Sequence, residues 1–343
     1  MFPLIAYRKL YSSLREHRRV EDEIQLLLAE LLEAAHIRSS GLPRRNPLAY
    51  AQRHFFSILF LSIYESIGIP AERRLLYGML NHCLRGIVTG ADNLLDDEYK
   101  ELLPLNFPEP ATRFKSIMHL LLFDRMLFRI HERFRNLQLL PSGSVSLDTA
   151  LFKAIVPIGA EEAQEEGGVK EIITPAAVLD TVHMYKGGKL LCLSFVAPRL
   201  LEPPAFQTRL ACADQGIFHI GVALQLIDDL TDFYEDILAD NHNYLVSSIF
   251  HQGSAEEQRQ LRTILDNPAN GPAIETTFPA TLRQVMAKSV SEALHGFALL
   301  QEAGYWLNQQ QAYDLVRQLF VLRGVKQLLP FFPPATATGP TPP

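Results

Sequence analysis

The chain has 343 residues, of which 48% are hydrophobic and 20% are charged. This composition is typical of a globular protein with a substantial core, and it excludes disorder over most of the length. The formal net charge is −6, from 32 Lys and Arg against 38 Asp and Glu, so bulk attraction to nucleic acid or to an anionic membrane surface is not expected. Much of the acid excess lies in two short segments, residues 91–98 and 225–236.

The ends and the cysteines of the sequence indicate a cytoplasmic protein. Arg8 and Lys9 interrupt the apolar start, so no signal-peptide core is present. Three cysteines stand far apart in the chain: Cys83, Cys192 and Cys212. An odd number without a CxxC pair is typical of small core residues in a reducing compartment. The longest charge-free apolar runs, 54–64 and 216–227, are shorter than the ~18–20 residues of a membrane span, so we expect no span.

Apolar residues recur at intervals of three and four along almost the whole chain, which predicts helices. The segment 20–35 shows the pattern clearly, with Val20, Ile24, Leu27 and Leu31 on one face. The same spacing predicts helices over 47–68, 71–97, 111–138, 147–165, 174–200, 205–238, 277–302 and 308–329. Gly- and Pro-rich breaks separate these segments, and no alternating strand is found. We therefore predict one all-α domain of about ten long helices over 1–332, with a Pro-rich flexible tail over 333–343.

Two charged runs are expected on the surface. The run 161–166 contains four glutamates and is predicted to be a solvated helix end, with a minor role near the diphosphate as the alternative. A short basic cluster is predicted to form an exposed helix face: Arg15, His17, Arg18 and Arg19. The eleven histidines show no HxxxH or HExxH spacing, so the sequence does not predict a zinc site.

The two acidic segments each end an apolar helical stripe. In the first, Asp92 follows Val88 by four residues and Asp96 follows Asp92 by four, so these residues share a helix face. In the second, a stripe that includes Leu224 leads into acids with spacing i, i+4, i+8: Asp228, Asp232 and Asp236. Asp97 and Asp229 stand beside these faces.

Such an arrangement is unfavourable unless a cation binds to it. Like charges at i,i+4 destabilise a helix, and the C-terminal half of a helix disfavours carboxylates. Inward-facing carboxylates without a partner cost considerably more. Mg²⁺ is typically bound by one or two carboxylates, water and substrate phosphate. The two segments together therefore predict a divalent-cation site, although solvated helix ends are the alternative for either one alone.

The segments Asp92-Asn-Leu-Leu-Asp96 and Gln225-Leu-Ile-Asp228-Asp229-Leu-Thr-Asp232 resemble the two aspartate-rich motifs of class I isoprenoid synthases. They are most similar to those of the trans-prenyl diphosphate synthases, the polyprenyl synthetase family. A third segment, Tyr185-Lys186-Gly-Gly-Lys189-Leu190, resembles the family's lysine motif and precedes Asp228 at about the family's spacing. The resemblance covers roughly residues 35–250 and implies an isoprenoid synthase fold, in which a helical bundle surrounds a central cavity.

The resemblance implies a mechanism and a set of site residues. Mg²⁺, three ions with substrate bound, would hold the diphosphate of an allylic prenyl substrate, and metal charge would stabilise the leaving diphosphate. It implies metal ligands in both motifs: Asp92, Asp96, Asp97, Asp228, Asp229, Asp232 and Asp236. The catalytic set would be Asp92, Asp96, Asp228, Asp232 and Lys186, with Arg44, Arg45, Lys186 and Gln225 binding diphosphate. It also implies a homodimer. Aromatic candidates for stabilising the carbocation are Phe55, Phe56, Phe60, Phe195 and Phe218.

The sequence departs from the family pattern in several places. Asn93 stands where the family has its second aspartate, and the segment 99–104 lacks the Arg-Arg pair that follows the first motif. The upstream diphosphate-binding motif is reduced to the segment 41–47, which keeps Arg44 and Arg45. These losses affect mainly the site for the second substrate, isopentenyl diphosphate.

Three functions follow from the resemblance. Prenyl transfer in isoprenoid biosynthesis fits the motifs best. A terpene synthase that cyclises one prenyl diphosphate fits the i, i+4, i+8 acids of the second motif, and the segment 232–236 also resembles squalene and phytoene synthases. A non-catalytic partner subunit of a prenyl synthase is the third possibility.

Overall fold

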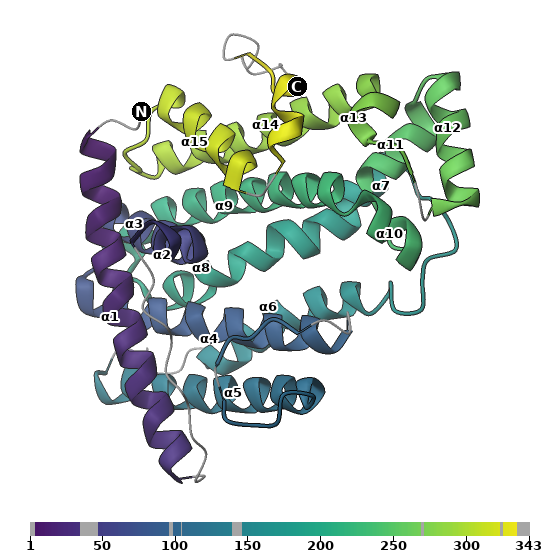
Figure 1. Ribbon diagram of the computed structural model, residues 1–343. Helices are drawn as coiled ribbons and strands as arrows, with labels where there is room; N and C mark the ends of the chain where they lie inside the picture. The colour runs from purple at the N-terminus through teal and green to yellow at the C-terminus, as the bar shows by residue number, and fades with distance from the viewer. Residues whose placement is uncertain are drawn as a thin grey trace. The chain divides into compact units, whose positions relative to one another are not determined.

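The computed structural model describes residues 4–34, 47–95, 99–103, 105–138, 146–268, 271–322 and 325–334 (Figure 1). These residues form helices joined by loops and turns, and no strand occurs among them. The predicted all-α class is therefore confirmed. Within the predicted tail, only residues 333 and 334 belong to the described part of the chain.

Contacts between Cα atoms divide the chain into two compact units. Unit 1 comprises Met1–Leu151 and Leu193–Gln207, and unit 2 comprises Phe152–Cys192 and Thr208–Pro343. The boundaries fall within three helices: α6 (Leu147–Glu162), α8 (Leu190–Leu201) and α9 (Pro204–Thr231). Each unit buries apolar side chains of its own, and the prediction of a single domain over 1–332 stays a prediction.

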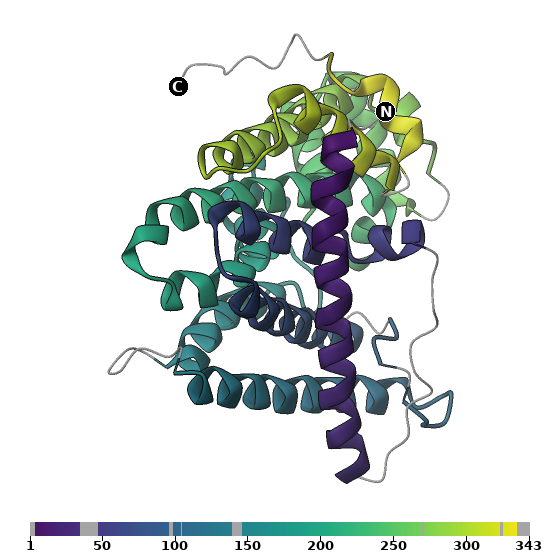
Figure 2. The same cartoon turned by 90° about the vertical axis from the view of Figure 1, so that its left-hand side faces the viewer.

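Unit 1 is built on long helices that pack along one another. Its helices are α1 (Leu4–Ala34), α2 (Pro47–Arg53), α3 (Phe55–Ile67), α4 (Ala71–Leu95) and α5 (Thr112–Asn136). The helix α1 contacts α3, α4 and α5, and α4 lies along α5 (Figure 2). The apolar residues of the predicted stripes face inward, because Ile24, Ile63 and Ile130 are fully buried. Each such side chain contributes about 1.5–3 kcal/mol by leaving water.

Unit 2 is built around α9. Its other elements are α7 (Pro175–Val178), the π-helix η1 (Leu179–Lys189), α10 (Phe233–Ala239), α11 (Tyr244–Gln252), α12 (Ala255–Asp266), α13 (Ile274–Thr277), α14 (Pro279–Glu302), α15 (Gln309–Leu322) and the 3-10 helix η3 (Lys326–Phe331). The helix α14 approaches α9 closely, because a Cβ on Gly216 would lie 2.7 Å from the Gly296 carbonyl oxygen. The Ser289 hydroxyl donates a hydrogen bond to the Ala223 carbonyl at 2.9 Å, which fixes the same contact.

Most of the predicted helical segments are observed as helices, although α1 begins at Leu4 and not at residue 20. The segment 47–68 is interrupted at His54, and the segment 205–238 is interrupted at Asp232. Three short helices, α11, α12 and α13, lie largely outside the predicted segments. The helix α12 has a capping box in which the Ser254 hydroxyl accepts from the Glu257 N–H at 3.2 Å. The Ser-x-x-Glu spacing is a sequence signal that could have found it.

The helix α9 contains a long apolar stretch. By length and composition it could cross a membrane, and it is the one helix with this property among the described residues. In this structure 61% of its most apolar window is buried inside the protein, as expected for the central helix of a unit. The absence of a membrane span stays a prediction.

The lysine segment packs against α9 backbone to backbone. It forms the π-helix η1, a rare geometry that is frequent at functional sites. A Cβ on Gly187 would lie 2.5 Å from the Gly221 carbonyl oxygen, and a Cβ on Gly221 would be equally crowded by the Gly187 carbonyl. Only glycine fits at either position, which explains the first glycine of the Lys-Gly-Gly-Lys segment.

We predict that Gly221→Ala lowers the free energy of unfolding by about 1–3 kcal/mol, because the new methyl group forces the two backbones apart. Urea denaturation of the purified protein measures this change. The matched control is Gly159→Ala on α6, where nothing lies within 4 Å of the new Cβ. That control should be neutral or stabilising by up to about 1 kcal/mol, since alanine favours a helix. Equal effects of the two substitutions would contradict the close approach.

Candidate functional site

The first acidic motif begins in the last turn of α4 (Ala71–Leu95), which lies within the predicted helix 71–97. Asp92 is half-buried there, and Asn93 is 3% exposed. Four predicted site residues lie outside the described part of the chain: Arg44, Arg45, Asp96 and Asp97. Asp92 is thus the only predicted metal ligand of this motif whose position the structure describes.

Asn93 closes the loop that follows the motif. Its side-chain Nδ2 donates to the Lys100 carbonyl at 3.1 Å, and its Oδ1 accepts from the Lys100 N–H at 2.9 Å. An ionised aspartate could accept the second bond but could not donate the first. The departure from the family pattern at this position therefore has a structural reason in unit 1.

A buried cation lies beside the segment that follows the first motif. The Lys115 ammonium lies 5.4 Å from the centre of the Tyr99 ring, and the Lys115 residue is 6% exposed. The Tyr99 ring stacks on the ring of His119, whose Nε2 contacts the Leu103 carbonyl at 3.1 Å. This segment carries Lys100, which is exposed, and no arginine pair.

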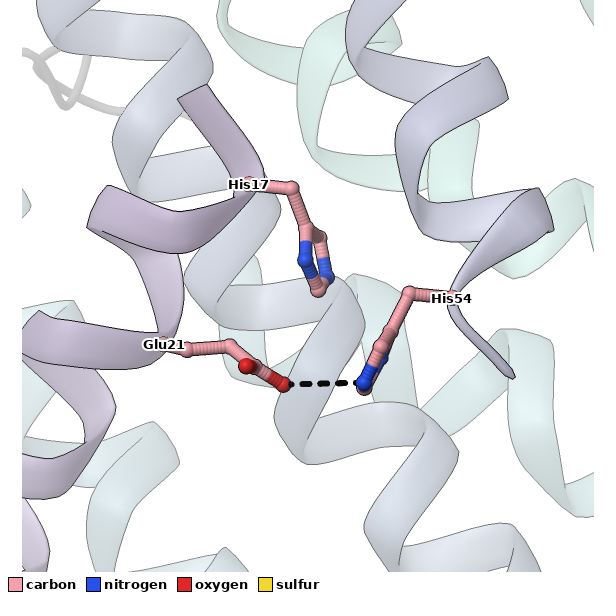
Figure 3. A group of neighbouring side chains, drawn as sticks. All are labelled: His17, Glu21 and His54. Carbon is pink, nitrogen blue, oxygen red and sulfur yellow. Dashed lines mark ion pairs between the residues drawn. The ribbon is translucent and has the colours of Figure 1, made fainter. Parts of the chain in front are cut away.

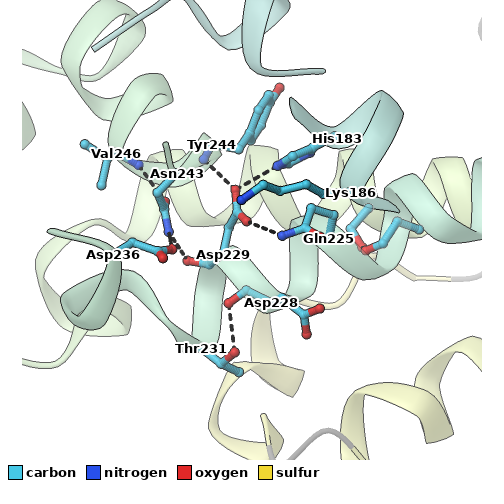
Figure 4. A network of polar contacts seen from close by, with 12 residues as sticks. His183, Lys186, Gln225, Asp228, Asp229, Thr231, Asp236, Asn243, Tyr244 and Val246 are labelled. Atoms are coloured by element: carbon cyan, nitrogen blue, oxygen red, sulfur yellow. Dashed lines mark hydrogen bonds and ion pairs between the residues drawn. The ribbon is translucent and has the colours of Figure 1, made fainter. Parts of the chain in front are cut away.

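The second acidic motif is organised around the carboxylate of Asp229 (Figure 4). Its Oδ2 lies 2.9 Å from the His183 Nε2 and accepts from the Tyr244 N–H at 2.5 Å. Its Oδ1 accepts from the Gln225 Nε2 at 3.3 Å. The side chains of His183 and Asp229 are 1% and 3% exposed. Asp229 therefore joins η1, α9 and the start of α11.

Asn243 extends this network toward Asp236. Its Nδ2 donates to the Asp229 carbonyl and to the Asp236 Oδ2, both at 2.8 Å. Its Oδ1 accepts from the Val246 N–H at 3.1 Å and caps α11. One amide side chain thus fixes the end of the acidic motif and the start of the next helix.

Asp228 and Asp232 lie on another side of the motif. The Asp228 side chain is half-buried and points away from the Asp229 network in Figure 4. The Thr231 hydroxyl lies 2.8 Å from the Asp228 carbonyl and 2.7 Å from the Asp232 Oδ1. The backbone bonds from Asp232 N–H to the Asp228 carbonyl, at 2.9 Å, and from Asp236 N–H to the Asp232 carbonyl continue across the break between α9 and α10. The i, i+4, i+8 relation of the three acids is therefore kept.

The ammonium of Lys186 is held by two carboxylates. Its Nζ lies 2.9 Å from Glu162 Oε1 and 2.5 Å from Glu165 Oε2. Burial by itself would lower the pKa of Lys186, but the charges and hydrogen bonds of Glu165 and Glu162 outweigh it, so the pKa is raised and the lysine is charged. The prediction that the run 161–166 is a solvated helix end is wrong for Glu165, which is 8% exposed.

Burial and like charges act on Asp236. Burial, together with the charges of Asp229 and Asp232, raises its pKa to about 7, against the hydrogen bonds from Asn243 and Asn241 that lower it. A carboxyl group that is destabilised in its charged form by neighbouring carboxylates is a site where a cation would bind favourably.

The aromatic candidates divide between the units. Phe60 and Phe195 are buried in unit 1 and meet edge to face with ring centres 6.5 Å apart. Phe218, in unit 2, covers Gly188, and the Lys189 ammonium lies 5.7 Å from its ring centre. Phe55 and Phe56 are half-buried and also pack edge to face.

Sequence reasoning missed three partners of the predicted site residues: His183, Asn243 and Glu165. The family pattern gives no signal for them, because each acts across a long sequence distance. His183 does have a signal in hindsight, since it lies three residues before Lys186, whereas Glu165 is 21 residues before it and has none.

The buried contact between His183 and Asp229 predicts that removal of the Asp229 carboxylate strongly lowers stability. We expect Asp229→Ala to lower the free energy of unfolding by about 3–5 kcal/mol, because it leaves His183 and the Tyr244 N–H buried without their acceptor. Asp180→Ala, an exposed acid on the same π-helix, is the control and should change stability by less than about 0.5 kcal/mol. Chemical denaturation of both variants provides the comparison, and a wild-type stability for Asp229→Ala would refute the assignment.

The raised pKa of Asp236 predicts a pH-dependent penalty. The folded protein keeps the proton that the unfolded chain loses near pH 4, so this group destabilises the fold as the pH rises toward about 7. In chelator-treated buffer, Asp236→Asn should therefore gain roughly 2–4 kcal/mol at pH 8 and little at pH 4. Thermal or urea unfolding at the two pH values tests this, with the exposed Asp266→Asn as control. A gain that is the same at both pH values would contradict it.

Comparisons with known proteins find similarity in structure and not in sequence. No protein-family model matches the sequence, and no curated protein matches it either. Solved structures match over nearly their whole length. The decaprenyl diphosphate synthase of Rhodobacter capsulatus is 14% identical, with a TM-score of 0.60, and the match covers 90% of this chain and 99% of that one.

Two further structures agree. The octaprenyl pyrophosphate synthase of Helicobacter pylori is 13% identical with a TM-score of 0.60, over 88% of this chain and 98% of that one. The geranylgeranyl pyrophosphate synthase of Lactobacillus brevis is 16% identical with a TM-score of 0.56, over 89% and 97%. At this level of identity the likeness establishes the fold. The resemblance carried by the two acidic motifs and the lysine segment is thus confirmed at that level: the chain has the all-α fold of the isoprenoid synthases.

Proposed function

We propose that the chain is a Mg²⁺-dependent enzyme that ionises an allylic prenyl diphosphate and transfers the prenyl group to isopentenyl diphosphate. The fold it shares with structures named as prenyl diphosphate synthases supports this reaction class. A homodimeric assembly, which rests on the resemblance, and a cytoplasmic location, which rests on the cysteines and the charged start of the sequence, belong to the same proposal.

One observation carries the proposal: the lysine segment and the second acidic motif are built into one rigid surface of unit 2. Gly187 contacts α9 at Gly221, and its Cβ position lies 3.1 Å from the Gln225 Cβ, one turn before Asp228. His183, three residues before Lys186, holds Asp229. A cation-binding acid motif and a diphosphate-binding lysine are the two parts that such chemistry requires side by side.

The side chains of the second motif suit a divalent cation. Carboxylate oxygens are the ligands that Mg²⁺ prefers. Burial and the charges of Asp229 and Asp232 raise the pKa of Asp236 to about 7, and a bound cation would offset those charges. For Asp92 of unit 1 the role of metal ligand rests on the resemblance, and within unit 2 we assign a metal site to Asp228, Asp232 and Asp236. Asp229 supports them, because three protein donors already occupy its carboxylate. When bound, Mg²⁺ would neutralise the charge that develops on the leaving diphosphate.

The chain's own residues have defined roles in this reaction. The C–O bond of the allylic diphosphate breaks, and the diphosphate leaves with the electron pair. Lys186 has three N–H donors, two of which face Glu162 and Glu165, and the third is assigned to a diphosphate oxygen, as is the Gln225 amide. The double bond of isopentenyl diphosphate then attacks the allylic cation, a C–C bond forms, and a proton is lost to restore a double bond.

The carbocation must be kept from water. The apolar residues that precede each acidic motif are buried, including Leu80 and Leu84 on α4 and Leu224 on α9. We assign the stripe on α9, in unit 2, to the prenyl chain. The burial of these residues does not indicate the length of the prenyl chain, and the similar structures are named for products of different lengths.

A terpene synthase reaction on one prenyl diphosphate is the alternative. It is favoured by the segment after the first motif, where the Asn93 amide holds the Lys100 backbone and no arginine pair is present to bind a second diphosphate. A non-catalytic partner subunit is the third candidate and would give the acidic motifs no chemical role.

The deciding experiment incubates the protein with allylic diphosphates of several lengths and Mg²⁺, with and without isopentenyl diphosphate. A longer diphosphate that forms only with isopentenyl diphosphate supports transfer. A hydrocarbon or alcohol that forms without it supports the cyclase. No Mg²⁺-dependent diphosphate release from any substrate would overturn both.

We predict that Asp92→Ala and Asp228→Ala each lower kcat at least about a hundredfold, because each removes an assigned metal ligand. Folding should change little, since both side chains are half-buried at helix ends. Asp266→Ala, an exposed acid at the end of α12, is the control and should keep full activity. Full activity of either motif variant would refute the metal assignment.

A further inference from the structure

A second polar group, which the proposed function does not use, is buried in unit 1. His17 and Glu21 lie one turn apart on α1, and His54 lies at the break between α2 and α3. His17 is 1% exposed and His54 is 7% exposed, so the predicted exposed helix face is wrong for His17. The three side chains point toward one another from two separate segments (Figure 3).

The distances suit one small ion. One potential ligand atom from each of the three residues lies within 4.8 Å of the others. The His54 Nε2 and the Glu21 Oε1 are 3.3 Å apart, which is about the separation of two ligand atoms on a tetrahedral ion with bonds near 2.0–2.1 Å. The other pairs of ligand atoms would have to approach by at most about 1.5 Å, since none is farther apart than 4.8 Å.

Tyr50 orients the first histidine for coordination. The His17 Nδ1 lies 2.7 Å from the Tyr50 hydroxyl, which also hydrogen-bonds the Glu21 carboxylate. The hydroxyl can donate one proton only, so with Glu21 accepting it, the His17 Nδ1–H donates and the His17 Nε2 carries the lone pair. A histidine ligand held through its other ring nitrogen in this way is the usual arrangement around protein metals.

The carboxylate of Glu21 is incompletely satisfied. Its Oε1 is buried and makes no hydrogen bond. Burial raises the pKa of Glu21, against the Tyr50 hydrogen bond and the charges of Arg53 and Arg85, which lower it. Burial also lowers the pKa of His17 to about 2, helped by the neighbouring His54, His82 and Arg85. The ring of His17 is therefore neutral, the form that binds metals.

We propose that His17, Glu21 and His54 bind a divalent transition-metal ion of the Zn²⁺ class, which ties α1 to the junction of α2 and α3. The nearby arginines repel cations, so a hard ion held by charge alone, such as Mg²⁺ or Ca²⁺, is disfavoured. Two imidazole nitrogens and one carboxylate suit Zn²⁺ or Co²⁺ instead. A water completes the four ligands.

Cobalt titration of the chelator-treated protein tests the proposal. Millimolar Mg²⁺ is present throughout, so that the acidic motifs are occupied. We expect one Co²⁺ per chain with the intense visible absorption of a four-coordinate ion, loss of that absorption on adding Zn²⁺, and a higher melting temperature with either metal. The absence of this absorption at one equivalent would leave only an ion pair between His54 and Glu21 and would overturn the proposal.

Variants locate the site. His17→Gln and Glu21→Gln should each weaken Co²⁺ binding at least about tenfold, and Tyr50→Phe should weaken it roughly tenfold through the orientation of His17. The control is His131→Gln, which removes another buried histidine of unit 1, one whose Nδ1 lies 2.9 Å from Asp148. Binding that survives His17→Gln, or that is lost equally in His131→Gln, would refute it. Melting curves of the metal-free variants show that each one folds.

Discussion

The structure of unit 2 depends on the need to satisfy one buried carboxylate. An ionised Asp229 inside a protein is tolerable only when donors surround it, and the donors come from three different elements: η1, α9 and the start of α11. Each of these elements is held in position by its contact with the Asp229 carboxylate. Asp228 and Asp232 face elsewhere and are not among the donors to the Asp229 carboxylate, but the network around Asp229 helps to fix the segment that carries them. The motif thus contains a structural aspartate next to those proposed to do chemistry.

The sequence predicted the helices well because amphipathic spacing is a local property. The stripe of Val20, Ile24 and Leu27 is buried as expected. The sequence-based predictions failed where the burial of a residue depends on a partner far away in the chain. His17 stands among exposed arginines and was predicted to be exposed like them, but Tyr50 and His54 cover it. Glu165 was predicted to be solvated, but Lys186 follows it on a packed segment.

The motifs show the same limit in another form. The residue types and spacing of the acidic segments predicted the fold, which the solved structures support. They could not show that Asn93 binds the backbone of Lys100. An amide in place of an aspartate reads as the loss of a metal ligand until both of its hydrogen bonds are seen. They also could not show that Asp229 and Asp228, adjacent in the chain, have different tasks. Successive residues on a helix point about a quarter-turn apart, and only packing decides which direction is the interior.

The contact between Gly187 and Gly221 also limits how unit 2 can move. Two backbones that touch without side chains between them cannot slide past one another without meeting the next residue's Cβ. Lys186 is therefore attached to a fixed platform, and any rearrangement it makes toward a ligand occurs in its own side chain. Such rotamer changes take picoseconds to nanoseconds, whereas shifts of whole helices take microseconds or longer. Capture of an anion by the third N–H of Lys186 would then need a movement of this side chain alone, with Glu162 and Glu165 still bound to it, and no conformational change of the backbone.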